Sequence, residues 1–427
     1  MLKKEHNDYL TRTDAGTPMG RLFRCYWLPA LLASELPDDG CPPVRVGLLG
    51  EKLLAVRDGL GRYGLIQEFC AHRRVSLWFG ITETDGIRCP YHGWKYDTDG
   101  QCTEIPSEPE DSELCQRIRL TAYPLIKVGD VLWTYMGPPD LQPSEPEWEF
   151  ATVPSDQTYT SKRLQESNWL QAMEGGIDSS HVSWLHRGNL NSDPLFAGAH
   201  ANSYNLSDSR PVFEVVETEG GLAIGAKRDA EKGAWYWRIT PWVMPSFTMV
   251  PPRADHPLHG HFWIPIDDEN CWAWSFDYHP TRPLSRGERA AMEAGKGVHV
   301  RCEPGTFRPL ANKDNDYLID REAQRAGRTS SGVDGIGMQD ASLQESMGPI
   351  VDRSQEHLVS TDRGIVMARS RLLRAARALE QGVLPPGLTP AHQRVRSTAL
   401  ILPAGQPFDE PAKAAMEARG GKAHATV

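Results

Sequence analysis

The amino-acid sequence predicts an α+β fold with two domains: an N-terminal antiparallel β domain and a larger C-terminal domain in which helices cover an antiparallel sheet. Three observations lead to this prediction. The chain has 427 residues, more than one ordinary hydrophobic core accommodates. Residues 27–140 form short apolar or alternating runs separated by turn residues, as in a compact β domain. Residues 155–384 mix helical and strand patterns, which is typical of a sheet packed against helices.

The first domain, residues 27–140, is predicted from its strands and turns. Asp58-Gly59 and Asp97–Gly100 are turn signals between apolar runs. Strand patterns occur at residues 44–49, 52–57, 63–66 and 125–135. We expect residues 1–26 to pack on the larger domain and the proline-rich residues 141–154 to form the linker.

The second domain, residues 155–384, begins with a helical pattern around residues 168–185. Strand patterns follow at residues 213–216, 235–240, 247–250, 260–266 and 271–278, and the polar residues 267–270 predict a hairpin between the last two. A long amphipathic helix is predicted from about residue 353 to 381, with Leu358, Leu372 and Leu373 near one face. Residues 385–427 are rich in Pro, Gly and Ala, so we expect an irregular tail that frays at Gly420-Gly421.

Bulk properties exclude several classes of protein. The formal net charge of −10 argues against nucleic acid or an anionic membrane as the main partner. No apolar run reaches the roughly 18 residues that span a bilayer, and the first residues lack an apolar signal core. Several cysteines are scattered without disulfide-like or metal-like spacing: Cys25, Cys41, Cys102, Cys115, Cys271 and Cys302. We therefore expect reduced thiols and a cytoplasmic location.

Two short loops each pair one cysteine with one histidine: Cys70-x-His72 and Cys89-x-x-His92. Two thiolates on one iron and two imidazoles on the other are the ligands of a Rieske [2Fe–2S] centre. Two cysteines and two histidines also suit a tetrahedral zinc ion. Zinc fingers usually pair cysteine with cysteine and histidine with histidine, so the mixed loops favour the Rieske centre.

A second candidate metal site contains His181 and His186. Residues five apart do not share a face of a regular helix, so the backbone must bend or leave the helix between them. Two histidines and one carboxylate form the facial triad of non-haem Fe(II) oxygenases, which leaves positions open for O₂ and substrate. A histidine pair alone is a weak indication. A one-electron carrier upstream in the same chain strengthens it, because the electrons need an acceptor.

The carboxylate of this triad is expected to be Asp340, which opens a helical segment after a glycine-rich stretch. Glu345 on the same segment is the rival. Other candidates by residue type are Asp314, Asp316, Asp320, Asp352 and Asp362.

These motifs together resemble the oxygenase α subunit of the Rieske non-haem iron ring-hydroxylating family, over nearly the whole chain. The motifs that fall in family order are Cys70-x-His72, Cys89-x-x-His92, Asn168-Trp169, Glu174, Asp178-x-x-His181-x4-His186 and Gln339-Asp340. Residues 344–350, Asp352-Arg353 and residues 356–358 are similar to the phthalate 4,5-dioxygenase branch, which includes chlorobenzoate and phenoxybenzoate dioxygenases.

The resemblance implies cofactors and partners. It implies a Rieske [2Fe–2S] cluster, a mononuclear Fe(II) held by His181, His186 and Asp340, and no β subunit. Electrons would come from NADH through a separate reductase that carries flavin and a plant-type [2Fe–2S] centre. The family assembles as a homotrimer, and the sequence leaves open whether two rings stack into a hexamer. In such a ring Asp178 would bridge a cluster histidine of the neighbouring subunit (His92 or His72) and an iron ligand of its own chain.

The resemblance also implies the reaction: O₂ and reductase-delivered electrons hydroxylate an aromatic carboxylate such as phthalate or a substituted benzoate, as a cis-dihydrodiol. A monooxygenase or O-demethylase acting on an aryl ether carboxylate remains the alternative. An electron carrier with only the first domain active is a third interpretation, and the second metal site argues against it.

A substrate carboxylate needs a cationic partner, ideally an arginine that forms two hydrogen bonds. Arg210 and Arg238 are the preferred candidates, ahead of Arg228 and Arg253. Ser179, next to Asp178, adds a candidate hydroxyl for substrate binding.

Overall fold

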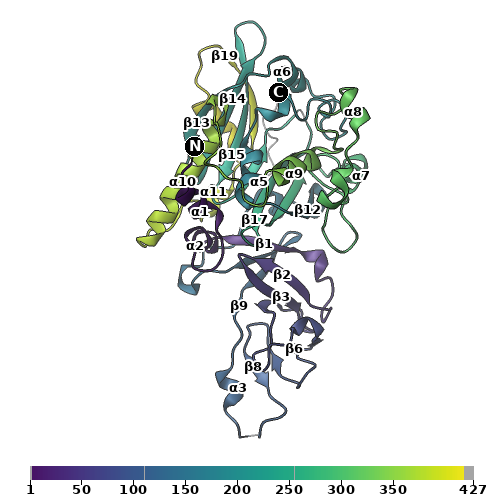
Figure 1. Ribbon diagram of the computed structural model, residues 1–427, viewed down its shortest axis with the longest axis vertical. Helices are drawn as coiled ribbons and strands as arrows, with labels where there is room; N and C mark the ends of the chain where they lie inside the picture. The colour runs from purple at the N-terminus through teal and green to yellow at the C-terminus, as the bar shows by residue number, and fades with distance from the viewer. Residues whose placement is uncertain (1, 110, 254, 418–427) are drawn as a thin grey trace.

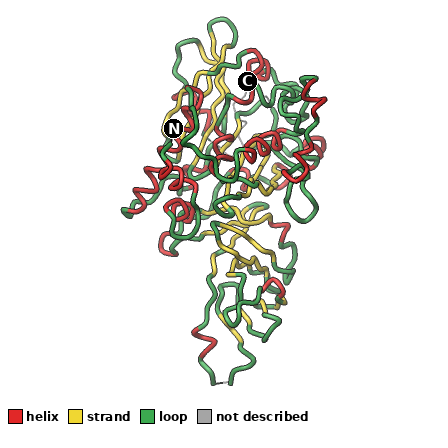
Figure 2. The backbone as a smooth tube through the Cα atoms, in the orientation of Figure 1, coloured by secondary structure: helices red, strands yellow, loops and turns green. Residues whose placement is uncertain are grey.

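The computed structural model describes residues 2–109, 111–253 and 255–417. Figure 1 shows a broad body, with a narrow extension of short strands below it. Strands run through the body, and helices and long loops surround them (Figure 2). Every named strand pair is antiparallel, so the α+β fold class is confirmed. None of the helices in the described ranges is long and apolar enough to cross a membrane.

An eight-stranded antiparallel sheet forms the centre of the body, in the order β12-β18-β17-β16-β15-β14-β13, and β19 also pairs with β15. The strands that the sequence predicted in this region are present, and β17 and β18 form the predicted hairpin. The strand bounds are β12 Thr158–Gln165, β13 Val212–Glu217, β14 Gly221–Asp229, β15 Ala234–Val243, β16 Phe247–Val250, β17 Leu258–Pro265, β18 Cys271–Tyr278 and β19 Thr398–Pro403.

The chain after Leu384 is not irregular, contrary to the sequence-based expectation. β19 joins the large sheet beside β15, and helix α12 (Asp409–Met416) follows it. The Phe408 ring stacks on Trp237 of β15 at 4.8 Å, which fixes the tail to the sheet. Gly420 and Gly421, which were expected to fray, lie outside the described residues.

The amphipathic helix is shorter than predicted. α10 spans Arg363–Glu380, and only the 3-10 turn Ser360–Asp362 precedes it directly. The residues from 353 onward follow an irregular path, and ion pairs to Glu174 and Arg369 hold this segment. Leu372 and Leu373 are buried as the amphipathic pattern requires, whereas Leu358 lies on the irregular segment and is partly exposed.

Two N-terminal helices, α1 (Lys4–Thr11) and α2 (Pro18–Arg24), pack against the larger domain. The Asn7 side chain donates to Val351 O at 3.0 Å, and the Asn168 side chain donates to Thr11 O at 2.9 Å. These contacts join α1 to the larger domain.

The remaining helices are short or lie around the sheet. Their bounds are α3 Leu114–Arg117, α4 Glu149–Thr152, α5 Trp169–Ile177, α6 Ala201–Ser207, α7 Arg286–Glu293, α8 Arg321–Arg325, α9 Ile336–Ser346 and α11 Pro390–Gln393. Figure 1 shows α5 and α9 beside the large sheet, in the middle of the body.

Three small sheets build residues 27–135. They have the orders β1-β11-β10, β2-β3-β4-β9 and β5-β6-β7-β8. The strand bounds are β1 Trp27–Leu32, β2 Val44–Leu48, β3 Glu51–Arg57, β4 Tyr63–Gln67, β5 Ile81–Glu83, β6 Gly86–Arg88, β7 Lys95–Tyr96, β8 Cys102–Glu104, β9 Ala122–Tyr123, β10 Leu125–Val128 and β11 Val131–Tyr135.

The two largest hydrophobic cores do not divide at the expected linker. The largest core joins β1, β3 and β11 to the large sheet, and a smaller core surrounds Cys70 and Cys89 in the extension. Trp148, from the stretch expected to be a linker, is buried in the large core and stacks on Phe247 at 4.1 Å. We propose residues 27–140 and 155–384 as functional units that share a core, with one metal centre in each.

Candidate metal centres and cavity

Helix α5 leads towards the histidine site and ends before it. Its last residue is Ile177, and Asp178 has an extended backbone (φ −88°, ψ 109°). His181 then begins a 3-10 turn. Because the chain leaves the helix here, His181 and His186 face one point, although a regular helix would turn them apart.

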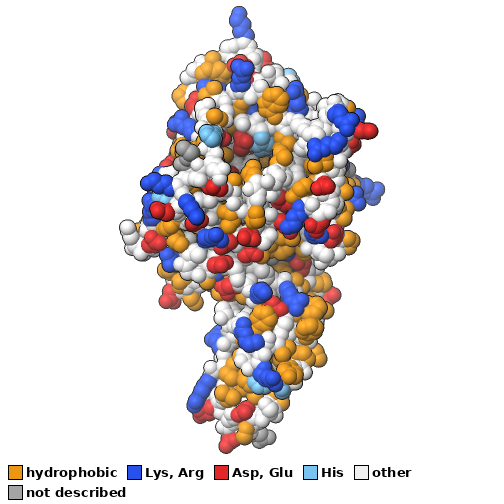
Figure 3. Space-filling model, in the orientation of Figure 1, with side chains coloured by type: hydrophobic (Ala, Val, Ile, Leu, Met, Phe, Trp, Pro, Cys, Tyr) orange, Lys and Arg blue, Asp and Glu red, His pale blue; other side chains and the backbone are white. Residues whose placement is uncertain are grey.

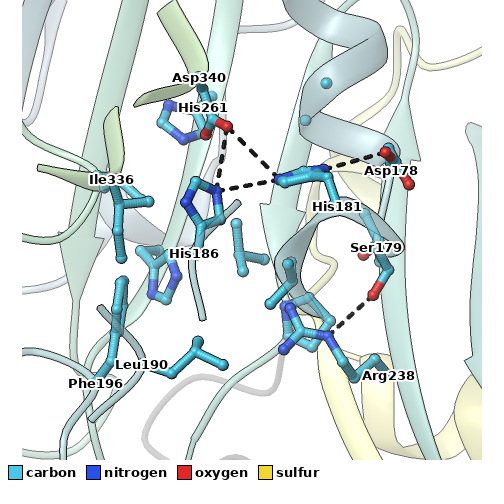
Figure 4. A pocket seen from close by; sticks show the side chains of 18 of the residues that line it. Asp178, Ser179, His181, His186, Leu190, Phe196, Arg238, His261, Ile336 and Asp340 are labelled. Atoms are coloured by element: carbon cyan, nitrogen blue, oxygen red, sulfur yellow. Dashed lines mark hydrogen bonds and ion pairs between the residues drawn. The ribbon is translucent and has the colours of Figure 1, made fainter. Parts of the chain in front are cut away.

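Helix α9 brings Asp340 to the same point. His186 Nε2 lies 3.2 Å from His181 Nε2 and 3.2 Å from Asp340 Oδ1, and His181 Nε2 lies 3.6 Å from that oxygen. Figure 4 shows the three side chains converging from separate segments. Glu345, the rival carboxylate, points elsewhere and accepts hydrogen bonds from Tyr317 Oη and Glu166 N.

Hydrogen bonds fix the orientation of both imidazoles. His181 Nδ1 lies 3.2 Å from Asp178 Oδ2, and Ser180 N donates to the other oxygen of Asp178. His186 Nδ1 lies 2.8 Å from Gln339 Oε1. In each ring, Nδ1 therefore lies within hydrogen-bonding distance of a partner, and Nε2 points towards the other two ligands.

The Gln339 side chain is held by several contacts of its own. Its amide nitrogen donates to Asn189 Oδ1, Thr329 Oγ1 and Val333 O, at 2.8, 3.2 and 3.1 Å. The amide oxygen therefore faces His186 and requires a proton on His186 Nδ1. No role for Gln339 within the Gln339-Asp340 motif followed from the sequence, because a glutamine carries no metal-ligand signal by type.

Electrostatics favour an ionised carboxylate at this site. Burial alone raises the pKa of Asp340, but the charges and hydrogen bonds of His186 and His181 outweigh it and lower the pKa to about 2. Burial likewise opposes protonation of His181, but Asp178 outweighs it and raises the pKa of the imidazole. Two nitrogen donors and one carboxylate oxygen within 4.8 Å of one another fit Fe(II) of the facial-triad type.

The cysteine–histidine loops lie in the extension. Cys70 and Cys89 are 1% and 2% exposed, whereas the rings of His72 and His92 lie nearer the surface, 4.4 Å apart. Trp94 stacks on the His72 ring at 4.7 Å. Two buried thiols and two outward imidazoles fit a cluster with one sulfur-ligated and one nitrogen-ligated iron. Burial raises the pKa of the Cys89 thiol, so metal binding must displace its proton.

A cavity opens beside the triad and is lined by both apolar and cationic side chains. Leu190, Phe196 and Ile336 form part of an apolar wall, and Arg238 and Arg253 also reach the lining. Figure 4 shows Arg238 on the Ser179 side of this cavity. A planar apolar ring with an anionic substituent fits such a lining.

The structure shows which of the candidate arginines lie at the cavity. Arg238 lines the cavity and donates from Nε to Ser179 Oγ at 3.1 Å, so Ser179 orients the arginine. Arg210 is exposed and is not among the residues that line the cavity, whereas Arg253 is, so the structure does not place Arg210 with Arg238. Arg210 follows a turn at Asp208 and precedes the edge strand β13. Residue type alone could not predict this exposed position. Arg228 is buried and donates to Ser179 O at 2.8 Å.

Both arginines of the cavity are incompletely paired. Arg238 and Arg253 are 1% and 3% exposed. In the part of the chain that the structure describes, Nη1 of each has no hydrogen-bond partner. Burial lowers the pKa of both guanidinium groups, and the charge of Arg238 lowers that of Arg253 further. Buried cations without a carboxylate partner are costly, so an anionic ligand is the natural complement.

Comparison with known proteins decides the family. Residues 26–124 match the Rieske [2Fe–2S] domain, and residues 134–410 match the LigXa C-terminal domain-like family. The oxygenase subunit of 3-chlorobenzoate-3,4-dioxygenase from Comamonas testosteroni is 37% identical over 92% of this chain and 93% of that protein.

The chain is an oxygenase α subunit of the Rieske non-haem iron ring-hydroxylating family.

Other relatives of this Rieske oxygenase are named for different reactions. The oxygenase subunit of phthalate 4,5-dioxygenase from Pseudomonas putida is 35% identical over 90% of this chain and 88% of its own length. That of 5,5'-dehydrodivanillate O-demethylase from Sphingobium sp. (strain NBRC 103272 / SYK-6) is 30% identical over 91% and 84%. A crystal structure of dicamba monooxygenase bound to dicamba has the same fold, with a TM-score of 0.59 at 18% identity over 84% of this chain and 99% of that one.

Family membership removes two alternatives. The Rieske match spans both cysteine–histidine loops, so the zinc interpretation is wrong. The second match spans the triad, so the chain is an oxidoreductase and not an electron carrier alone. As a Rieske oxygenase it uses a [2Fe–2S] cluster and mononuclear iron, with electrons from a reductase.

Proposed function

We propose that this Rieske oxygenase hydroxylates an aromatic carboxylate, such as phthalate or a substituted benzoate, by adding both atoms of O₂ as a cis-diol. The observation that carries the proposal is the pair of buried, incompletely paired guanidinium groups, Arg238 and Arg253, in the cavity of the triad. A carboxylate would complete their hydrogen bonds, and Leu190, Phe196 and Ile336 would contact the ring. The chlorobenzoate and phthalate enzymes among the relatives are named for substrates of this class.

The proposal includes the ligands of both metal centres. Cys70, His72, Cys89 and His92 hold the [2Fe–2S] cluster, and His181, His186 and Asp340 hold Fe(II). When bound, the iron activates O₂ with electrons from the cluster. The protein's own groups keep His181 and His186 in position, hold the substrate carboxylate and keep the ring in an apolar, largely water-free site.

Electron delivery is proposed to cross a subunit interface in a homotrimer. Asp178 would connect a cluster histidine of a neighbouring subunit to His181, with which it already pairs. NADH electrons would reach the cluster from a separate flavin and [2Fe–2S] reductase. Near Asp178 the surface depression is partly apolar, with Leu343 and Met347 43% and 52% exposed.

The cluster end of the extension carries a matching apolar surface. Phe79, Ile81 and Tyr91 are 63%, 62% and 53% exposed. Figure 3 shows hydrophobic side chains gathered along one edge of the extension. Two exposed apolar patches, one at each metal centre, suit contact between copies of the chain.

Monooxygenation or O-demethylation of an aryl ether carboxylate is the second candidate, favoured by the O-demethylase among the relatives. Labelled O₂ distinguishes the two reactions. A dioxygenase puts two labelled atoms into one product, whereas a monooxygenase puts in one and releases the other as water.

Substitution of the cavity arginine tests the substrate class. In Arg238→Ala we expect the Kd for benzoates to rise roughly 10- to 100-fold, because a charge-assisted hydrogen bond is lost. The matching benzamides should change little, and this comparison within one variant removes general effects on folding. Arg210→Ala is the matched control and should bind both series as the unmodified protein does. Equal losses for acids and amides in Arg238→Ala would contradict the carboxylate assignment.

A further inference from the structure

The large sheet presents a row of polar side chains towards the cavity side. β17 and β18 pair so that His259 lies opposite Asp277 and His261 lies opposite Ser275. Side chains alternate between the two faces of a strand, so these four share a face. Phe276, between Ser275 and Asp277, points to the other face and lies in the large core.

Asp277 on this face forms a hydrogen-bonded series with His299 and Ser161, and the series reaches towards His259. Ser161 Oγ lies 2.7 Å from His299 Nδ1, and His299 Nε2 lies 2.8 Å from Asp277 Oδ2. Asp277 Oδ1 then lies 4.0 Å from His259 Nδ1, which also faces Pro257 O at 3.4 Å. A shift of about 1 Å would bring His259 into hydrogen-bond range of Asp277. His299, Asp277 and His259 are each 2% exposed, so bulk water does not reach them directly.

The two ends of the series meet different environments. Ser161 is partly exposed on β12, the outermost strand of the sheet. His259 lines the cavity, and its Nε2 is buried and has no hydrogen-bond partner among residues 2–109, 111–253 and 255–417. One end can therefore exchange protons with solvent, and the other is a cavity-lining imidazole whose Nε2 has no partner in the described part of the chain.

We propose that Ser161, His299, Asp277 and His259 form a relay that carries protons from solvent into the cavity. The inference rests on the proposed function, because that reaction consumes protons there. For each turnover, two electrons from NADH reduce O₂, the O–O bond breaks and two C–O bonds form at the ring. Two protons end on the hydroxyl groups of the diol. Each proton that His259 releases is replaced through Asp277 and His299 from solvent at Ser161.

The surroundings of Asp277 bring the pKa of its carboxyl group closer to neutral pH. Burial raises the pKa of Asp277 to about 6, although His299 opposes this, and the charges of Asp193 and Glu288 add to the rise. Near neutral pH such a carboxyl group can gain or lose a proton.

The surroundings of His259, at the cavity end of the relay, favour the neutral imidazole. Burial lowers the pKa of His259 well below its usual range, and the charges of Arg253, His261 and Arg238 act in the same direction. A neutral imidazole has one protonated and one unprotonated ring nitrogen, and here Nδ1 faces Asp277 and Pro257 O while Nε2 is unpaired in the described part of the chain.

The first experiment needs no turnover. Infrared spectroscopy of the holoenzyme, without substrate or reductase, should show a protonated carboxylic acid band that disappears with a midpoint near pH 6. Asp277→Asn should remove this band. Ser275→Ala, on the same strand and face but outside the relay, should keep it. A spectrum in which Asp277→Asn leaves every titrating carboxyl band in place would overturn the relay.

The second experiment uses the holoenzyme with its reductase and a substituted benzoate. His259→Gln and Asp277→Asn should slow product formation roughly 10- to 100-fold, because proton transfer by a positioned group is lost. The solvent deuterium isotope effect should rise, whereas the substrate KM and the rate of cluster reduction should not change. Ser161→Ala, at the partly exposed end, should show a smaller change of the same kind and guards against misfolding of the buried variants. Ser275→Ala should match the unmodified enzyme.

Two results would reject the relay. A raised KM with an unchanged isotope effect in His259→Gln would make His259 a substrate contact instead. Full activity in Asp277→Asn would remove that residue from the route. If the unmodified enzyme accepts no aromatic acid, the proposed substrate class fails. The infrared titration then still tests the relay.

Discussion

At the scale of single residues, the site contains groups that orient the metal ligands as well as the ligands themselves. Gln339 is fixed by Asn189, Thr329 and Val333, and so directs one tautomer of His186 towards the triad. A side chain with no hydrogen-bonding capacity at position 339 would leave His186 Nδ1 buried and unpaired.

Replacing Gln339 tests this role. We expect Gln339→Leu to lower the affinity for Fe(II) roughly 10- to 100-fold, with the [2Fe–2S] absorption retained. Iron analysis after dialysis against a chelator measures the change. Ser342→Ala, on the same helix, removes only a hydrogen bond to the Gln339 carbonyl and should keep the iron. Iron content equal to that of the unmodified protein in Gln339→Leu would mean that other contacts hold His186.

Asp178 gives a second prediction at this scale. Its carboxylate pairs with His181 Nδ1, and although burial opposes ionisation, this pairing and the Ser180 hydrogen bonds lower its pKa. Asp178→Asn should keep both metals bound, but electron transfer from the cluster should be roughly 100-fold slower, because the bridge loses its charge. Single-turnover kinetics of cluster oxidation measures this rate. An unchanged rate would refute the bridge.

Residue type predicted the ligands better than it predicted the cavity. Cysteine, histidine and aspartate carry metal chemistry in any fold, so the ligand sets proposed here could be chosen from the sequence. Arg210 and Arg253 are alike by type, and only the fold buries Arg253 beside Phe196, with its guanidinium 4.5 Å from the ring centroid. The relay could not be predicted from the sequence either, because only the pairing of β17 with β18 and the folded position of His299 bring its residues together.

At the scale of secondary-structure elements, a buried ionic network ties helix α5 to the C-terminal part of the chain. Glu174 on α5 contacts Arg369 Nε at 2.6 Å and Arg353 Nη2 at 3.0 Å. The contact to Arg353 also holds the segment that the sequence predicted as helix. The spacing of hydrophobic residues could not show that this segment is irregular, because the ion pair that holds it comes from α5, which is far away in the sequence.

Glu174→Gln should destabilise the protein by about 3–5 kcal/mol, because two buried guanidinium groups each lose a charged partner and only Arg369 keeps a close one, Glu356. Urea denaturation followed by tryptophan fluorescence measures the free energy of unfolding. Glu217→Gln is the matched control, because Glu217 pairs with Arg371 and Arg374 while half exposed, and should cost less than about 1 kcal/mol. Similar losses in both variants would contradict the importance of burial.

The same network predicts a pH dependence of stability. Burial opposes ionisation of Glu174, but Arg353 and Arg369 outweigh it and lower the pKa of the folded state. The unfolded chain therefore binds more protons in acid. The contribution of Glu174 is present above the unfolded pKa of about 4.3 and is lost as the pH falls through the lower folded value. The stability of Glu174→Gln should depend less on pH across this window.

At the scale of the whole molecule, the two metal centres lie in different parts of one chain. The cysteine–histidine loops belong to the narrow extension, and the triad lies between α5, α9 and the large sheet in the broad body (Figure 1). This separation, with an exposed apolar patch at each centre, supports electron transfer between neighbouring subunits rather than within one chain. The sequence implied such a ring only through family resemblance, since surface patches depend on the folded shape.

Mixing two inactive variants tests this arrangement. Cys89→Ala should lack the cluster, and Asp340→Ala should lack the mononuclear iron, so each variant alone should be inactive. In trimers formed by co-expression, an intact cluster of one subunit can face an intact triad of the next. Random assembly should then restore about one quarter of the normal activity per chain, because one interface in four combines the two intact centres. Separately purified trimers, mixed without subunit exchange, are the control and should stay inactive. Co-expressed variants that remain inactive, although mass spectrometry shows mixed trimers, would require transfer within a single chain.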